Sequence, residues 1–176
     1  IFFELFIDDF QITRANRGEI PDAFAWKFGV DGALKYNNWP ITFELEYTKI
    51  SGNTYITRGW FTNWEDRNIP IGYKYGPDCE SLYLFADCWV NRNFLVSTKI
   101  NYLEKGSLTL DSQYNEYGRP KSPSNPVQYY TYFSPAIAWH HNYGIIEIGR
   151  EGSIDNIKNN SFYVKLQLIL GFGFEV

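Results

Sequence analysis

Aromatic and charged side chains are concentrated between residues 60 and 80. Flat apolar rings can stack on sugar rings, and charged neighbours can hydrogen-bond sugar hydroxyls or pair with uronic acids. We therefore predict glycan contacts for Trp64, Tyr73 and Tyr75. The alternative is a belt of aromatic residues at a membrane interface beside a solvated loop tip, and this is the interpretation we prefer for Trp60 and Phe61.

A second stretch, DSQYNEYGRPKSPSNP over residues 111–126, has the same mixture of aromatic and basic side chains. Its candidates for glycan binding are Tyr114, Tyr117 and Arg119, with Lys121 beside them. The proline and serine content indicates an exposed loop more firmly than it indicates a ligand site.

Paired carboxylates at Glu44 and Glu46 would lie on one face of a strand, roughly 7 Å apart. Such a pair could support glycoside hydrolysis, in which two carboxyl groups act as acid and as base or nucleophile. Lysines on corresponding faces of other strands favour a different interpretation, a charge network that fills the lumen of a barrel. The predicted lumenal network comprises Lys27, Asp31, Lys35, Glu44, Glu46, Lys99, Glu147 and Lys165.

Other reactive side chains do not form a recognisable site. The members of the pairs Asp8-Asp9 and His140-His141 point to opposite faces of a strand, so neither pair is a natural metal chelate. Ser134 and His140 could be imagined as an acyl-transfer pair, but no nucleophile or oxyanion motif accompanies them. We predict no metal, no cofactor and no catalytic residue. An outer-membrane or secreted enzyme acting on glycans or lipids is the alternative.

The element that would carry these residues is clearest at residues 162–176, where FYVKLQLILGFGFEV places an apolar residue at every second position. This period of two predicts a strand with one continuous apolar face. Fifteen residues would span roughly 45 to 50 Å, much longer than an ordinary soluble strand. A strand of this length and pattern suits a bilayer.

Similar segments recur along the chain, and the connections between them alternate between short and long. We read residues 41–60 as one strand with a bulge at Ser51-Gly52-Asn53; the alternative is a hairpin turn there. The eight predicted strands are Ile1–Ile7, Phe24–Tyr36, Ile41–Trp60, Ser81–Val90, Phe94–Lys105, Val127–Asn142, Ile145–Ile154 and Phe162–Val176. This pattern predicts an all-β fold, an antiparallel transmembrane β-barrel of the outer-membrane type. A soluble β-sandwich or a lipocalin-like barrel is the alternative.

Composition is consistent with one domain over residues 1–176. The net charge of −4 argues against a nucleic-acid partner. No apolar run approaches the 18 or more residues of a transmembrane helix. Cys79 and Cys88 would lie roughly 30 Å apart on one strand, so we expect free thiols.

Several strings resemble the capsule assembly Wzi family of bacterial outer-membrane proteins. They are ELFIDDFQI (residues 4–12), EYTKISGNTY (residues 46–55) and IPIGYKYGPDCESLYL (residues 69–84), and the terminal GFGFEV is similar to the closing strand of outer-membrane barrels. The resemblance covers most of the chain and implies the C-terminal part of a larger barrel of about eighteen strands. The abrupt start in mid-strand fits an expectation of further residues upstream.

The resemblance also implies a role. Family members are non-enzymatic, lectin-like barrels that help to retain capsular or other extracellular polysaccharide, and some relatives are linked to surface adhesion and gliding. We therefore expect an outer-membrane location, with lipid, surface polysaccharide and other outer-membrane proteins as partners. A structural or adhesion component of a surface complex is a further alternative.

Overall fold

The computed structural model describes residues 1–9, 23–56, 65–66, 69–70, 72–112, 121–142, 144–153 and 160–168. Every regular element in these ranges is a strand. The same residues contain no helix long and apolar enough to cross a membrane.

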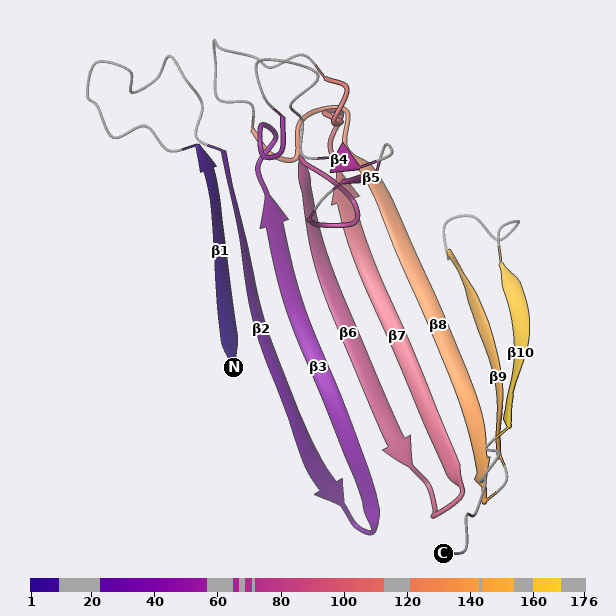
Figure 1. The fold of residues 1–176 in the computed structure, drawn as a ribbon. Helices are drawn as coiled ribbons and strands as arrows, with labels where there is room; N and C mark the ends of the chain where they lie inside the picture. The colour runs from indigo at the N-terminus through magenta and orange to yellow at the C-terminus, as the bar shows by residue number, and fades with distance from the viewer. Residues whose placement is uncertain are drawn as a thin grey trace, which may run out of the picture. The chain divides into compact units, whose positions relative to one another are not determined.

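Eight long strands form one antiparallel sheet in the order β1-β2-β3-β6-β7-β8-β9-β10 (Figure 1). They are β1 (Phe2–Asp9), β2 (Ala23–Tyr36), β3 (Trp39–Ile50), β6 (Cys79–Trp89), β7 (Phe94–Lys105), β8 (Gln128–His141), β9 (Gly144–Ser153) and β10 (Ser161–Leu168). The all-β class and the eight antiparallel strands are confirmed. In the described residues the sheet is open, because its order begins at β1 and ends at β10.

The connections alternate in length as predicted. Two residues, Asn37 and Asn38, join β2 to β3, and Asn37 adopts a positive φ of 55° that asparagine tolerates in tight turns. The turn between β6 and β7 is closed by the Asn91 side chain, whose Oδ1 accepts hydrogen bonds from the backbone N–H groups of Asn93 and Phe94. Long connections follow β1, β3, β7 and β9.

The prediction of one continuous strand over residues 41–60 is wrong at residues 51–56; a turn forms there, and no strand follows it up to residue 56, while residues 57–60 lie outside the described residues. β3 ends at Ile50, and residues 52–55 form a turn that is held by the Thr54 N–H, which donates to the Ser51 carbonyl at 3.1 Å. The next strand beside β3 in the sheet is β6, and the short hairpin of β4 (Glu65–Asp66) and β5 (Ile69–Pro70) precedes it. The ladder stops at Ser51 because the Phe24 N–H donates to the Ser51 hydroxyl and not to its carbonyl, which instead accepts from the Thr54 and Asp78 N–H groups.

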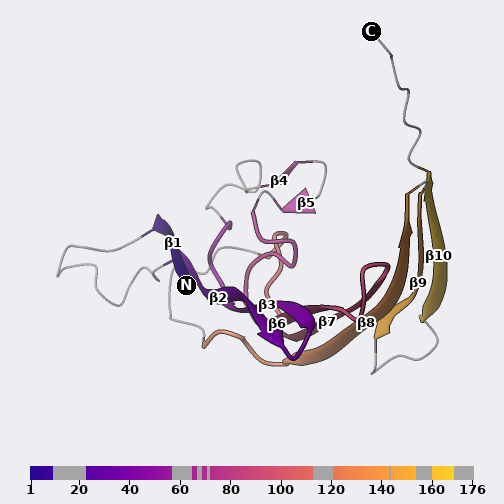
Figure 2. The ribbon, with the colours of Figure 1, turned by 90° about the horizontal axis from the view of Figure 1, so that it is seen from below.

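The chain divides into two compact units. Unit 1 comprises residues 1–30, 46–82 and 102–130, and unit 2 comprises residues 31–45, 83–101 and 131–176. The buried cluster lies in unit 1, where loop segments 51–56 and 72–78 cover one face of the strands (Figure 2). Its members are Ala25, Ile50, Tyr55, Cys79, Leu103 and Leu110.

In unit 1, the opposite face of the sheet is apolar and exposed. The register pairs Phe3 with Phe28 and Leu5 with Trp26, so these large side chains share a side of β1 and β2. Phe3 and Leu5 are 62% and 55% exposed. The side chains between them include Glu4 and Lys27, which are also paired in register, so charge lies on the other side.

Unit 2 shows the same division of its two faces. β10 pairs Val164 with Ile148, which pairs with Ile137 of β8, and all three side chains are more than half exposed. The alternate row pairs Lys165 with Glu147. The predicted alternation is therefore confirmed up to Leu168, and residues 169–176 of the predicted closing strand lie outside the described residues.

Cys79 and Cys88 lie on β6 and are both free thiols, as expected. Cys79 is buried at the beginning of this strand, and its Sγ lies 3.4 Å from the Gly76 carbonyl oxygen.

Candidate functional site

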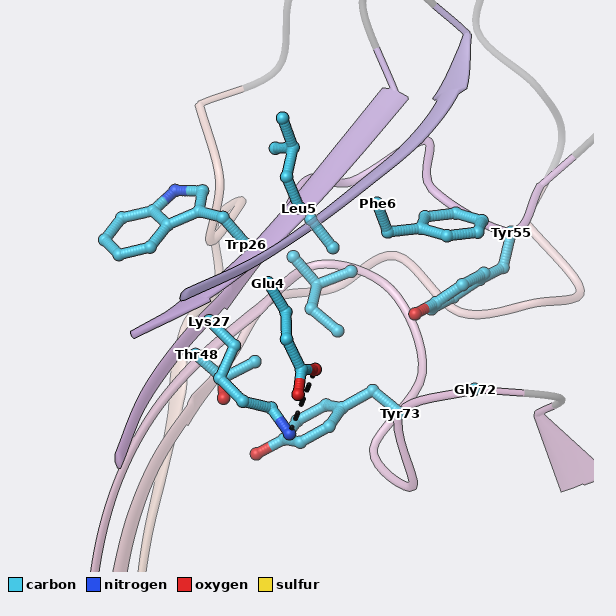
Figure 3. Close-up of a pocket in the computed structure, with 11 residues that line it drawn as sticks. Glu4, Leu5, Phe6, Trp26, Lys27, Thr48, Tyr55, Gly72 and Tyr73 are labelled. Carbon is cyan, nitrogen blue, oxygen red and sulfur yellow. Dashed lines mark ion pairs between the residues drawn. The ribbon is translucent and has the colours of Figure 1, made fainter. Parts of the chain in front are cut away.

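A cavity of about 360 Å³ opens on the polar face of unit 1 (Figure 3). Strands β1, β2 and β3 form its floor, and the loop segments around Tyr55 and Tyr73 form its wall. The volume lies within the range of roughly 300 to 1,000 Å³ that small-molecule sites occupy. The cavity is lined by Glu4, Leu5, Phe6, Ala25, Trp26, Lys27, Thr48, Ile50, Tyr55, Gly72 and Tyr73, of which Leu5 and Trp26 belong to the row of side chains on the apolar face.

Aromatic rings make up one side of this cavity. The rings of Phe6 and Tyr55 are neighbours (Figure 3), with their centroids 5.4 Å apart and their planes inclined at 42°. Tyr73 packs edge to face against Tyr75 at 5.5 Å, and the Lys74 ammonium lies 4.6 Å from the centre of the Tyr75 ring. The cavity itself thus offers the rings of Phe6, Tyr55 and Tyr73, and apolar ring faces suit the faces of sugars.

Charged groups make up the floor. Lys27 Nζ lies 3.5 Å from Glu4 Oε2 and 3.4 Å from Glu46 Oε2, so one ammonium bridges two carboxylates. The Thr48 hydroxyl donates to Glu46 Oε1 at 3.2 Å. These groups can accept hydrogen bonds from hydroxyls and donate to a carboxylate, and the Glu4 side chain is 66% exposed and open to a ligand.

Tyr73 connects the cavity to the strand behind it. Its hydroxyl is hydrogen-bonded to the buried hydroxyl of Ser81 on β6. Burial raises the pKa of Tyr73 to about 12, so the phenol stays protonated at neutral pH. The ring is therefore held in a fixed orientation at the edge of the cavity.

A buried carboxylate fixes the loops around the cavity. Asp78 is fully buried and adopts a positive φ of 57°. Its Oδ1 accepts from the Ser122 hydroxyl at 3.1 Å and from the Ser124 N–H at 3.0 Å. Its Oδ2 accepts from the Leu108 N–H at 3.0 Å and from the Ser124 hydroxyl. One side chain therefore joins three segments of the chain, and we name this group the Asp78 clamp.

The backbone of the clamp requires glycine at two positions. Gly76 has a φ of 71°, a left-handed conformation that glycine adopts without steric cost. A Cβ atom at Gly106 would lie 2.0 Å from Asp78 Oδ2, so no other residue fits there without moving the carboxylate. The Gly106 N–H also donates to the Asp78 carbonyl at 2.8 Å.

Only two of the six residues predicted to bind glycan lie within the described residues. Tyr73 lies at the cavity and Tyr75 packs against it, so these two are brought together. Trp64, Tyr114, Tyr117 and Arg119 lie outside the described residues. The structure adds Glu4, Phe6 and Tyr55, which the sequence reasoning missed as site residues because their partners come from distant segments.

The predicted lumenal charges divide between the two units. Lys27 lines the cavity of unit 1 and forms an ion pair with Glu46, which lies beside the cavity. Lys99, Glu147 and Lys165 line a second cavity in unit 2. Three members of the set, Asp31, Lys35 and Glu44, also lie in unit 2, where Asp31 and Lys35 are exposed and Glu44 is half-buried.

One ion pair of unit 1 was not predicted. Lys49 on β3 pairs with Glu80 on β6, and the Tyr47 hydroxyl donates to Glu80 Oε2 at 2.6 Å. Glu80 was read as a loop residue before the strand that we expected to begin at Ser81. Among the described residues, no three His, Cys, Asp or Glu side chains are grouped as a metal ion would require.

The site and the fold define an all-β protein with a polar, aromatic-walled cavity on one face of an antiparallel sheet. The chain matches no family model, no curated protein and no solved structure. The resemblance to the capsule assembly Wzi family therefore stays a prediction from the sequence.

Proposed function

We propose that this chain forms the wall of an outer-membrane β-barrel. The support is the inverted arrangement of its sheet, because large apolar side chains are exposed on one face while ion pairs and hydrogen bonds lie on the other. Soluble domains rarely expose a continuous apolar surface of this kind. Short turns alternating with long loops are the other characteristic of this barrel class.

Aromatic side chains near the strand ends support the same proposal. In unit 1, Tyr102 and Tyr129 stack at 6.4 Å near the long-loop ends of β7 and β8. In unit 2, Tyr36, Trp39 and Trp139 are exposed near the short turns. Membrane barrels place such aromatic belts at the two lipid–water interfaces, where amphipathic rings are favoured.

The second part of the proposal is that the cavity of unit 1 binds a surface polysaccharide without cleaving it. The observation that carries it is the Lys27 ammonium between Glu4 and Glu46 beside the Tyr73 ring. A sugar unit can place a ring face on the tyrosine and its hydroxyls on the carboxylates. Capsular or other extracellular glycans, outer-membrane lipid and other outer-membrane proteins are the partners that we propose, in agreement with the family resemblance.

A binding experiment with matched variants tests the cavity. Glu46→Gln and Lys27→Gln should each reduce retention of capsular polysaccharide at least tenfold in a pull-down with the detergent-solubilised protein, because each removes one member of the charged floor. Lys35→Gln makes the same chemical change at an exposed lysine outside the cavity and should bind as the parent does.

Two results would contradict the proposed binding. Equal retention of polysaccharide by Lys27→Gln and Lys35→Gln would show that the cavity of unit 1 does not bind it. Chain shortening of the glycan during incubation would favour the enzymatic alternative, in which Glu44 and Glu46 act as the carboxyl pair.

A further inference from the structure

A second cavity, of about 260 Å³, lies on the polar face of unit 2. Two rows of side chains cross β8, β9 and β10 to build it. One row is Ala138, Glu147 and Lys165, and the next is His140, Ile145 and Gln167. The rest of the lining comes from β6 and β7 and consists of Phe85, Asp87, Leu95, Ser97 and Lys99. The cavity therefore lies within a single unit and is formed by paired strands.

Two polar atoms of the lining have no hydrogen-bond partner among the described residues. They are Asp87 Oδ1 and His140 Nε2, and both are shielded from solvent. Leaving such an atom unsatisfied is unfavourable, so each can gain a hydrogen bond from a ligand. The rest of each side chain is held in place, since the Thr42 hydroxyl donates to Asp87 Oδ2 at 3.4 Å and the His140 ring lies 4.8 Å from the Trp89 ring.

The ammonium groups of the two lysines in this cavity can also donate further hydrogen bonds. Within the described residues, neither Lys99 nor Lys165 has a carboxylate oxygen within 4.0 Å. The Lys99 ammonium instead lies 5.7 Å from the centre of the Phe85 ring. Glu147 accepts a hydrogen bond from the Tyr163 hydroxyl at 2.8 Å. The cavity thus contains free donors and free acceptors side by side.

We propose that this second cavity binds a neutral, hydroxyl-rich ligand of the size of one hexose. Two ammonium groups balance two carboxylates, so an anion would meet Asp87 and Glu147, and a cation would meet Lys99 and Lys165. A hydroxyl group can both donate to Asp87 and accept from a lysine. The volume lies just below the roughly 300 Å³ at which drug-sized sites begin, which fits a single sugar ring. The inference does not rest on the cavity of unit 1 or on membrane insertion.

Trp89 provides the readout, because its ring contacts His140 at the cavity. Titration of the detergent-solubilised protein with D-glucose, D-galactose or D-mannose should give a saturable change in tryptophan fluorescence at millimolar concentrations. The change should disappear in Trp89→Phe while calorimetry still detects binding. D-glucuronate and D-glucosamine should bind at least tenfold more weakly than the best neutral sugar.

Variants separate this site from other surfaces. Lys99→Gln and Asp87→Asn should weaken binding at least tenfold, and Lys35→Gln should not change it. Circular dichroism shows whether each variant folds. If either Lys99→Gln or Asp87→Asn fails to fold, the binding measured with the folded variant tests the proposal. The proposal is overturned if none of the three neutral hexoses gives saturable binding, if Lys99→Gln binds as Lys35→Gln does, or if a charged sugar binds most tightly.

Discussion

Asp78 is the residue on which the loop structure of unit 1 depends most. Its buried carboxylate accepts hydrogen bonds from three side-chain or backbone groups of Ser122 and Ser124 and from the Leu108 N–H. Every one of these partners is a donor, so a carboxylate fits and an amide does not. The clamp brings together residues 78, 106–108 and 122–124, which are far apart in the sequence.

Asp78→Asn should lower the free energy of unfolding by about 2–4 kcal/mol, because the new NH₂ group faces donors and leaves them unsatisfied. Urea unfolding of the solubilised protein measures the change. Asp31→Asn is the matched control, since Asp31 is exposed. An Asp78→Asn midpoint equal to that of Asp31→Asn would show that the clamp does not stabilise the loops.

At the scale of elements, the strands illustrate what a sequence can predict. The period of two is set by backbone geometry alone, so β7 was predicted with its observed bounds, Phe94–Lys105. The end of β3 at Ile50 was missed because the Ser51 carbonyl accepts from the Thr54 and Asp78 N–H groups, and Asp78 lies 27 positions away. For the same reason the sequence identified Tyr73 and Lys27 separately, but it did not show that they line one cavity.

Aromatic rings cover glycines at several places in the sheet. In unit 2, Tyr163 pairs in register with Gly149, and a Cβ atom on that glycine would lie 2.5 Å from the ring. In unit 1, Phe2 covers Gly29 in the same way. A glycine in a strand weakens it, and an aromatic neighbour that covers the bare backbone restores packing.

Gly149→Ala should therefore destabilise the protein by about 1–3 kcal/mol, because the methyl group displaces the Tyr163 ring. A double-mutant cycle with Tyr163→Ala checks the cause. In the Tyr163→Ala background the alanine has room, so its cost should fall by at least half. Equal costs in the two backgrounds would show that the ring does not press on the glycine.

At the scale of the whole molecule, the distribution of apolar side chains is the feature that requires explanation. Among the described residues, more large hydrophobic side chains are exposed than buried, and the exposed ones follow the alternation of the strands. A water-soluble protein would have to hide this surface against a partner. In the barrel that we propose, a lipid bilayer would cover this surface directly and leave the polar face for ligands.

Two tryptophans in unit 2 lie on opposite faces of the sheet, one on the apolar face and one on the polar face. Trp139 of β8 pairs in register with Ile146, which pairs with Leu166 on the apolar face. Trp89 of β6 packs against His140 on the polar face. If the apolar face contacts lipid, only the Trp139 ring lies on the lipid side of the sheet, in the aromatic belt next to the acyl chains.

Quenching of tryptophan fluorescence by brominated lipid is the most direct test of this arrangement. The protein is inserted into vesicles with and without brominated acyl chains, and the quenched fraction is compared for Trp139→Phe and Trp89→Phe. Contact of the apolar face with lipid predicts that Trp139→Phe lowers the quenched fraction and that Trp89→Phe does not. A lower quenched fraction in Trp89→Phe alone, or a protein that remains in the aqueous phase without quenching, would contradict it.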